Sequence, residues 1–235
     1  MSSRRPDPRK LAATPPLSKP EADLARLKKM LRRVIGNDEA AIQRVFEAGG
    51  ADALRILDIA CGDCREADTL GETFSELKAE HTGPEATPLD IQLTGIDVRA
   101  REIADAQRRF GGKREDKKTG GKREAEFLVG DASKLDQHKQ LGDGENFDVV
   151  FMRHQNYWNG DRTWEEIFDQ ALHKLDDEGR LVITSYFDDE HQLALDAIQK
   201  LGGKLIVTER NEESRELSTP GKSIDRHVAV FRKKD

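Results

Sequence analysis

Apolar residues in the later part of the chain gather in short runs that alternate with longer amphipathic stretches. The runs are rich in residues that favour strands, and they predict strands at 54–60, 93–97, 125–131, 147–153 and 180–187. Helical periodicity between them predicts helices at about 64–80, 99–110, 133–141 and 163–175. Near-continuous apolar strands that alternate with helices are typical of a parallel sheet covered on both faces. We therefore expect an α/β fold with a doubly wound, mostly parallel sheet.

The pattern changes at both ends of this region. After a last helix near 189–201, the segments KLIVTER and RHVAVFR are apolar and have only polar residues between them. Two strands without an intervening helix are expected to pair as an antiparallel hairpin at one edge of the sheet. Upstream, residues 21–35 carry their apolar side chains on one helical face, and a second short helix follows, with Asn37 or Asp38 as its cap.

These patterns divide the chain into three parts. Residues 1–20 contain five of the eight prolines and predict a disordered tail. Residues 21–49 predict an N-terminal helical cap, and residues 50–235 predict one α/β domain. A segment at 108–124, rich in Lys, Arg and Gly, is expected to be a solvated loop. The alternative is an arm that binds the phosphates of nucleic acid or an anionic substrate.

Composition narrows the classes of partner. The formal net charge of −6 gives no general attraction to nucleic acid, although the 108–124 segment leaves a local contact open. No stretch approaches the roughly 20 apolar residues that span a bilayer, so we expect no membrane insertion. The first residues lack the apolar core of a signal peptide, and two cysteines are too few to staple a secreted fold. A cytoplasmic protein is therefore expected, while its oligomeric state stays open.

Both cysteines, Cys61 and Cys64, lie in the sequence LRILDIACGDCREADTL, between an expected strand and an expected helix. A structural zinc site needs about four ligands, and no second cysteine pair or closely spaced histidine pair completes one, so no metal is expected. A redox dithiol also begins a helix, but Asp58 and Asp63 would disfavour its thiolate. A third interpretation needs no sulfur chemistry, because a tight turn of small residues lets the backbone approach a ligand at the start of a helix. The residues at alternate positions of this turn are Asp58, Ala60, Gly62 and Cys64.

The stretch LDIACGDCREA resembles the first motif of class I S-adenosylmethionine-dependent methyltransferases, an acidic residue followed by a Gly-x-Gly-x-Gly turn. Here Gly62 is the one glycine that remains. LTGIDV resembles the second strand of the family, FLVGDASKL the third and FDVVFMRHQNYW the fourth, so the resemblance spans about residues 50–233. It implies a Rossmann-like fold and S-adenosylmethionine as cofactor. The residues it implies for cofactor binding are Asp58, Ala60, Cys61, Gly62, Asp97, Val98, Asp131, Ala132 and Arg153.

The segment RHQNYW at the end of the fourth strand carries the candidate catalytic residues. His154 titrates near neutrality and can remove a proton from an acceptor, and Tyr157 lies three residues further on. Arg153 can bind a carboxylate of the cofactor or of the acceptor. Because ligands of open α/β sheets bind at the carboxyl ends of the strands, the large aromatic residues are expected to surround the cleft. These residues are Tyr157, Trp158, Trp164 and Tyr186.

The function that the resemblance implies is methyl transfer from S-adenosylmethionine. We expect a small-molecule acceptor, because the chain carries no segment that reads as a separate recognition domain. The alternatives are a protein that binds the cofactor or its demethylated product without catalysis, and a Cys-x-x-Cys oxidoreductase. A further hypothesis is that the helix at 21–35 covers the cleft as part of a lid.

Overall fold

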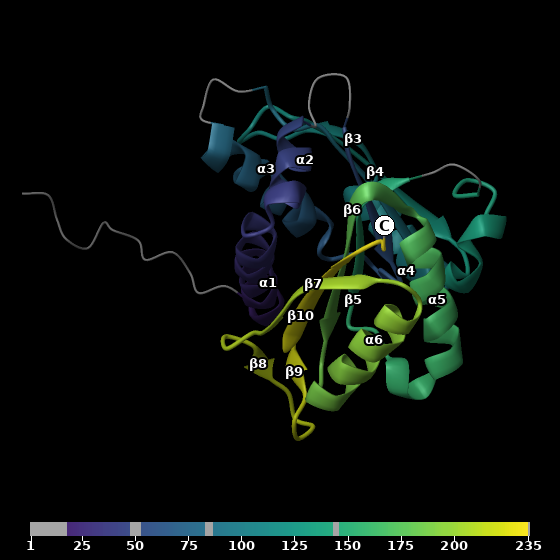
Figure 1. Ribbon diagram of the computed structural model, residues 1–235. Coiled ribbons are helices and arrows are strands. Elements are labelled where there is room, and N and C mark those ends of the chain that lie inside the picture. The colour runs from purple at the N-terminus through teal and green to yellow at the C-terminus, as the bar shows by residue number, and fades with distance from the viewer. Residues whose placement is uncertain (1–17, 48–52, 83–86, 143–145, 235) are drawn as a thin grey trace, which may run out of the picture.

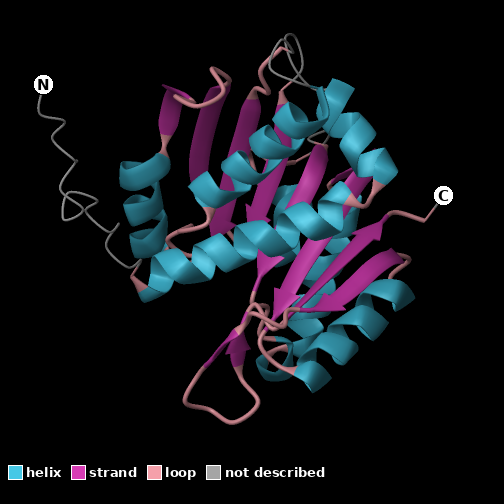
Figure 2. Ribbon diagram, turned by 90° about the vertical axis from the view of Figure 1, so that its left-hand side faces the viewer, coloured by secondary structure: helices cyan, strands magenta, loops and turns pink. Residues whose placement is uncertain are grey.

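The computed structural model describes residues 18–47, 53–82, 87–142 and 146–234. Their main feature is a twisted sheet with the strand order β3-β4-β2-β1-β5-β6-β10-β7 (Figures 1 and 2). The strands are β1 Leu54–Ile59, β2 Ile91–Asp97, β3 Gly112–Glu115, β4 Lys122–Val129, β5 Phe147–Arg153, β6 Leu175–Ser185, β7 Lys204–Arg210 and β10 His227–Arg232. A small separate ribbon pairs β8 Arg215–Glu216 with β9 Ser223–Ile224. The helices are α1 Lys19–Gly36, α2 Glu39–Glu47, α3 Ala67–Thr82, α4 Ala100–Phe110, α5 Asp161–His173 and α6 Asp188–Lys200.

The topology confirms the expected fold class. Neighbouring strands pair in parallel from β4 through β2, β1 and β5 to β6. The chain first adds strands on the β2 side of β1 and then crosses to add β5 on its other side, so the strand order reverses between β1 and β5. The strand β10 pairs antiparallel with both β6 and β7, which confirms the C-terminal hairpin. Buried apolar side chains form one cluster on each face of the sheet. Helices α1 to α4 contribute to one cluster, and α5 and α6 contribute to the other. A helix long and apolar enough to cross a membrane is absent from the described ranges.

The N-terminal helix α1 begins earlier than the sequence pattern indicates. Ser18 caps it, since the Ser18 backbone N–H donates to Glu21 Oε2 at 2.9 Å and the Ser18 hydroxyl accepts from the Glu21 N–H. Lys19 and Pro20 are therefore helical, and the remainder of the expected disordered tail lies outside the described residues. The apolar face of α1 packs along α3. Asp38 caps α2, as expected, by accepting from the Ala41 N–H at 3.2 Å.

The expectation of a solvated loop at 108–124 was wrong. The segment completes α4 and then forms β3, which pairs antiparallel with β4, so the expected third strand begins at Lys122 rather than at 125. All four residues of β3 are exposed, and this strand closes the edge of the sheet. Arg114 contacts Asp68, Lys118 contacts Glu76 and Arg123 contacts Asp116. These contacts offset much of the positive charge that the sequence places here.

Two further expected elements differ in their details. The helix expected at 133–141 is a short 3-10 helix at Ala132–Gln137, which Asp131 caps. The strand β6 begins at Leu175, five residues before the expected start, and α5 ends at His173. The shift at β6 leaves its carboxyl end at Ser185, close to the expected position, so the edge where a ligand would bind is unchanged.

Candidate functional site

A cavity of about 480 Å³ opens at the carboxyl ends of β1 and β5, where the sheet changes its direction of growth. This position is the usual ligand site of open α/β sheets. The first turn of α1 and the β8–β9 ribbon contribute to its walls, so segments from both ends of the chain cover it. The lining residues are Pro20, Asp23, Leu24, Ala60, Cys61, Gly62, Asp63, Arg65, Glu66, Arg99, Glu102, Arg153, His154, Tyr186, Arg215 and Ile224.

The turn between β1 and α3 is built from small residues, as the sequence predicted, and its backbone is strained. Ala60, Gly62 and Cys64 all have positive φ values, of 56°, 58° and 46°. A Cβ on Gly62 would lie 2.7 Å from Glu102 Oε2 and 2.9 Å from an Arg99 terminal nitrogen, so the space beside this glycine is confined. Cys64, at the third glycine position of the motif, is fully buried and its thiol donates to Asp58 Oδ2 at 3.1 Å. Its side chain therefore leaves the cavity side of the turn free.

The two thiols are buried and have raised pKa values. The neighbouring side chain of Cys64 lowers the pKa of Cys61, but burial and the charges of Asp58, Glu66 and Asp97 outweigh it and raise this pKa above its usual value. The neighbouring side chain of Cys61, followed by burial, raises the pKa of Cys64 well above its usual value. Thiols that stay protonated at neutral pH are poor nucleophiles, which argues against the oxidoreductase interpretation.

Asp97, at the end of β2, lies beside this turn. Its Oδ2 accepts from the Gly62 N–H at 2.9 Å, and its Oδ1 accepts from the Arg99 N–H at 2.9 Å and from Arg99 Nε at 3.0 Å. Burial raises the pKa of Asp97, but the hydrogen bonds from Arg99 and Gly62 outweigh this effect and lower it. The result is an ionised carboxylate held at the entrance to the turn, within reach of a ligand that approaches Gly62.

The other two acidic strand ends have different partners. Asp131 follows β4, the neighbour of β2, and its exposed carboxylate accepts from the Ser133 N–H at 3.0 Å. Asp58 is fully buried, and its Oδ1 has no hydrogen-bond partner in the described part of the chain. The three strand ends therefore share one edge of the sheet, but their carboxylates do not meet. Of the remaining expected cofactor residues, Val98 is 65% exposed and Ala132 is buried.

Asp58 forms a buried acidic pair with Glu66. Burial, followed by the charge of Glu66, raises the pKa of Asp58 well above its usual value. One ligand atom each of Asp58, Cys64 and Glu66 lies within 4.8 Å of the others, a spacing that a metal ion could bridge. A raised pKa disfavours the ionised forms of Asp58 and Cys64 that a metal would need as ligands, and we assign no metal to this cluster.

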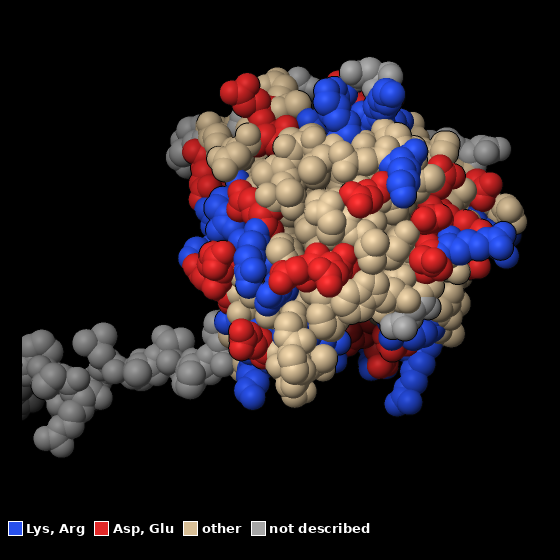
Figure 3. Space-filling model, turned by 60° about the horizontal axis from the view of Figure 1, so that its bottom comes forward, with Lys and Arg blue, Asp and Glu red and all other residues tan. Residues whose placement is uncertain are grey.

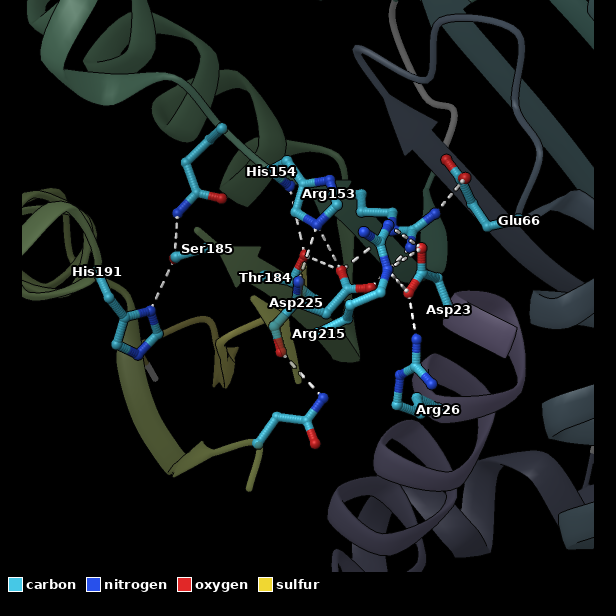
Figure 4. Close-up of polar contacts among 12 residues, drawn as sticks. Asp23, Arg26, Glu66, Arg153, His154, Thr184, Ser185, His191, Arg215 and Asp225 are labelled. Carbon is cyan, nitrogen blue, oxygen red and sulfur yellow. Dashed lines mark hydrogen bonds and ion pairs between the residues drawn. The ribbon is translucent and has the colours of Figure 1, made fainter. Parts of the chain in front are cut away.

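The end of β5 carries a connected ion-pair network (Figure 4). Arg153 donates to Asp225 Oδ1 and Oδ2 at 3.0 and 2.7 Å, and to Glu66 Oε2 at 3.2 Å. His154 Nε2 lies 2.8 Å from Asp225 Oδ1, and the His154 ring stacks on Tyr186 with 3.9 Å between ring centroids. His154 lines the cavity, as the sequence predicted for an acceptor-facing base.

Tyr157, the second expected catalytic residue, does not line the cavity. Its hydroxyl donates to Glu165 at 2.9 Å and its ring stacks on Phe168 beneath α5, so its side chain is buried away from the site. Trp164 also packs against Phe168, and Trp158 lies 48% exposed beside Phe187. Of the four large aromatic residues expected around the cleft, Tyr186 alone lines the cavity.

The sequence interpretation missed Glu66, Asp225, Asp23 and Arg215. Arg215 of β8 donates to Asp23 of α1 through Nε at 2.9 Å and through its terminal nitrogen at 2.6 Å, which ties the two covering segments together (Figure 4). On the face shown in Figure 3, basic and acidic side chains of the described residues are interspersed. This arrangement offers no broad basic surface for nucleic acid on that face.

The doubly wound sheet, the left-handed turn after β1 and the carboxylate at the end of β2 are features typical of α/β domains that bind nucleoside cofactors. Residues 51–222 match a family model described as a methyltransferase domain. Since this match covers most of the chain, the protein belongs to the methyltransferase-domain family. A search of curated proteins gives no match.

Solved structures agree in fold. An S-adenosylmethionine-dependent methyltransferase from Methanosarcina mazei is 18% identical, with a TM-score of 0.55 over 77% of this chain and 93% of that one. A protein from Pyrococcus horikoshii is 14% identical, with a TM-score of 0.55 over 93% and 92%. The magnesium protoporphyrin IX methyltransferase from Synechocystis, solved with bound S-adenosylmethionine, is 12% identical, with a TM-score of 0.53 over 96% and 89%. The protein is thus a class I methyltransferase that uses S-adenosylmethionine.

Proposed function

We propose that this enzyme transfers the methyl group of S-adenosylmethionine to a small-molecule acceptor that binds under α1, with His154 as the general base. The observation that carries the proposal is the single cavity that contains both the Gly62 turn and the His154 side chain. Small-molecule sites occupy about 300–1,000 Å³. A cavity of about 480 Å³ that also takes part of the cofactor leaves room for a small acceptor.

The residues of the turn fit the cofactor. The backbone at Gly62 has no side chain to obstruct a ligand, and Asp97 offers a carboxylate that can accept the two hydroxyls of a ribose. Arg99 lies on that carboxylate and would have to move aside. Asp131 and Ala132 are placed one strand further along the same edge, where the adenine would extend. Bound S-adenosylmethionine supplies a methyl group that its sulfonium has already activated.

The protein's own contribution is to orient the reactants and to exclude water. Arg153 is the candidate partner for the carboxylate of the cofactor, for which it must exchange its contact with Glu66. Tyr186 packs against the imidazole of His154 and limits its rotation. The segments α1 and β8–β9 close the cavity above these groups, so that the acceptor reacts in a water-poor space.

The test has a binding step and a turnover step. S-adenosylhomocysteine should raise the melting temperature, and at a hundredfold excess over Kd the gain in stability is about 2.7 kcal/mol. Asp97→Asn should weaken this binding, whereas Asp105→Asn, an exposed carboxylate on α4, should leave it unchanged. Incubation of the enzyme with a small-molecule extract and methyl-labelled S-adenosylmethionine should then transfer label to an acceptor detected by mass spectrometry. Cofactor binding without labelling of any small molecule would support the non-catalytic alternative.

A further inference from the structure

We propose that Asp225 is a positioning residue that holds His154 in the form in which Nδ1 accepts the proton of the acceptor. This inference rests on the proposed function and deepens it, because it specifies how the base acts and which acceptors need it. Asp225 lies between β9 and β10, 71 residues after His154, and outside the residues that match the family model.

Two polar groups reach Nε2 of the imidazole, and both belong to Asp225. His154 Nε2 lies 2.8 Å from Asp225 Oδ1, a distance at which an N–H donates to a carboxylate. No hydrogen bond to Nδ1 occurs within the described ranges, and Figure 4 draws none. Because His154 lines the cavity and Nε2 is directed at Asp225, Nδ1 is the nitrogen that remains for an acceptor.

The carboxylate of Asp225 is itself held rigidly. Only 1% of the residue is exposed, and its oxygens accept from Arg153 Nε, from an Arg153 terminal nitrogen and from Thr184 Oγ1, the last at 2.9 Å. The backbone of His154 is fixed by the same strand, since its N–H donates to the Thr184 carbonyl at 3.1 Å. Both His154 and Asp225 have left-handed backbones, with φ values of 60° and 48°. This backbone conformation is strained in residues other than glycine, and such residues tend to gather at functional sites.

Charged groups surround the imidazole of His154. The groups that face it are the carboxylate of Asp225, the guanidinium of Arg153 and the phenol of Tyr186, and Glu66 adds a second carboxylate through Arg153. Burial raises the pKa of Asp225, but the charges of His154 and Arg153 outweigh it and hold that pKa well below its usual value. Asp225 therefore offers the imidazole an ionised carboxylate.

This arrangement defines the chemical class of the acceptor. As the acceptor oxygen or nitrogen forms a bond to the methyl carbon, the carbon–sulfur bond breaks and its electron pair stays on sulfur. The proton of the acceptor passes to His154 Nδ1 and is later released to water. Only an acceptor with an O–H or N–H that is protonated at neutral pH requires this step. An alcohol, a phenol or an amine fits, whereas a carboxylate or a sulfide does not need the base.

The structure also contains a competing arrangement, which makes the proposal testable without an acceptor. The backbone N–H of Asp225 lies 3.1 Å from His154 Nε2, and it could donate to that nitrogen if Nδ1 carried the proton instead. One nitrogen cannot donate to Oδ1 and accept from this N–H at the same time. The two tautomers give different two-bond proton–nitrogen correlations in the NMR spectrum of ¹⁵N-histidine-labelled protein.

The experiment uses the full chain saturated with S-adenosylhomocysteine at about pH 8.5, with His154→Asn to assign the signal. We expect the Nε2–H tautomer in the wild type and a mixture of tautomers in Asp225→Asn. Asp188→Asn is the matched control, because Asp188 forms a similar ion pair with His227, at 2.6 Å, outside the cavity. It should leave the His154 signal unchanged.

An Nδ1–H tautomer in the wild type would overturn the proposal even if Asp225→Asn failed to fold. With an acceptor identified by the labelling experiment above, Asp225→Asn should also lower kcat about 100-fold when it is measured at saturating S-adenosylmethionine. An unchanged kcat would likewise overturn it. Loss of cofactor binding by the wild type, by contrast, would contradict the proposed function rather than the role of Asp225.

Discussion

Gly62→Ala tests whether the turn after β1 is shaped for the cofactor or only for folding. At this position φ is +58°, so any side chain adds backbone strain of about 1–2 kcal/mol. The new methyl carbon would also lie 2.7 Å from Glu102 Oε2 and 2.9 Å from an Arg99 terminal nitrogen. Both contacts are to the ends of flexible side chains, which can move, so the cost in stability stays near that of the strain alone.

The methyl group would stand beside Asp97, where the ribose is expected to bind. We therefore expect the melting temperature to fall by about 2–8 °C, since 1 kcal/mol corresponds to about 2–4 °C in a protein of this size. Affinity for S-adenosylhomocysteine should fall at least about tenfold, which corresponds to about 1.4 kcal/mol. Thermal unfolding measures the first effect and isothermal titration calorimetry the second.

Gly202→Ala is the matched control. This glycine has φ +98° at the end of α6, and a Cβ there would meet nothing within 4 Å. It carries a comparable backbone cost without a ligand nearby, so stability should fall while affinity for S-adenosylhomocysteine stays at the wild-type value. Equal affinities for the two variants would refute the assignment of the turn as the cofactor cradle.

Three further predictions concern buried polar groups. Asp38→Ala removes one partner of a buried ion pair with an arginine, and it should lower the free energy of unfolding, measured in urea, by about 3–5 kcal/mol. The control Asp105→Ala removes an exposed carboxylate and should lower it by at most about 1 kcal/mol. Burial raises the pKa of Glu190 to about 7, above its unfolded value of 4.5. The neutral carboxyl of Glu190 therefore contributes fully to stability below pH 4.5, and this contribution is lost as the pH rises through 7. Glu190→Gln should accordingly match the wild type at pH 4.5 and melt at a higher temperature at pH 8, and equal melting temperatures at pH 8 would contradict this sign. Cys61 and Cys64 should react with an aromatic disulfide reagent only after denaturation, and rapid labelling of the native protein would show that the thiols are accessible.

The turn and the strand ends that are proposed to bind the cofactor could be predicted as structural features because each of them is local. The parallel strands are buried on both faces and appear as continuous apolar runs, and the small residues of the turn follow the first of them directly. Asp97 could be placed because it ends a strand that must lie beside β1.

The sequence pattern did not predict β3, because this strand lacks the apolar run that marks the others. An edge strand whose four residues are all exposed needs no apolar alternation, and its charges protect the edge from further pairing.

Side-chain direction outside the strands could not be predicted in the same way. His154 and Tyr157 are three residues apart, yet one lines the cavity and the other packs under α5. The short 3-10 helix at Tyr157–Asn159 directs the Tyr157 side chain away from the cavity. The direction of this helix depends on packing against Phe168 rather than on any local sequence pattern.

Asp225 was missed although a signal for it existed. The hairpin was predicted, and an antiparallel strand inserted into a parallel sheet starts where its parallel neighbour ends. His227 is therefore paired with Ser185 at the carboxyl end of β6, and the residues just before β10 must lie at the ligand-binding edge. Because β10 rather than β7 pairs with β6, this register puts Asp225 at that edge, and the hairpin prediction alone did not specify which of its two strands would pair with β6.

This placement bears on how the acceptor is selected. Under the proposed function, the cofactor meets the turn and the ends of β1, β2 and β4, all within the residues that match the family model. The acceptor instead meets the start of α1, with Pro20, Asp23 and Leu24, and a base positioned by Asp225. His154 itself lies within the match, but Pro20, Asp23, Leu24 and Asp225 lie before residue 51 or after residue 222, outside it. The family similarity therefore carries information about the methyl donor, whereas the identity of the acceptor has to be sought in the two terminal segments that cover the cavity.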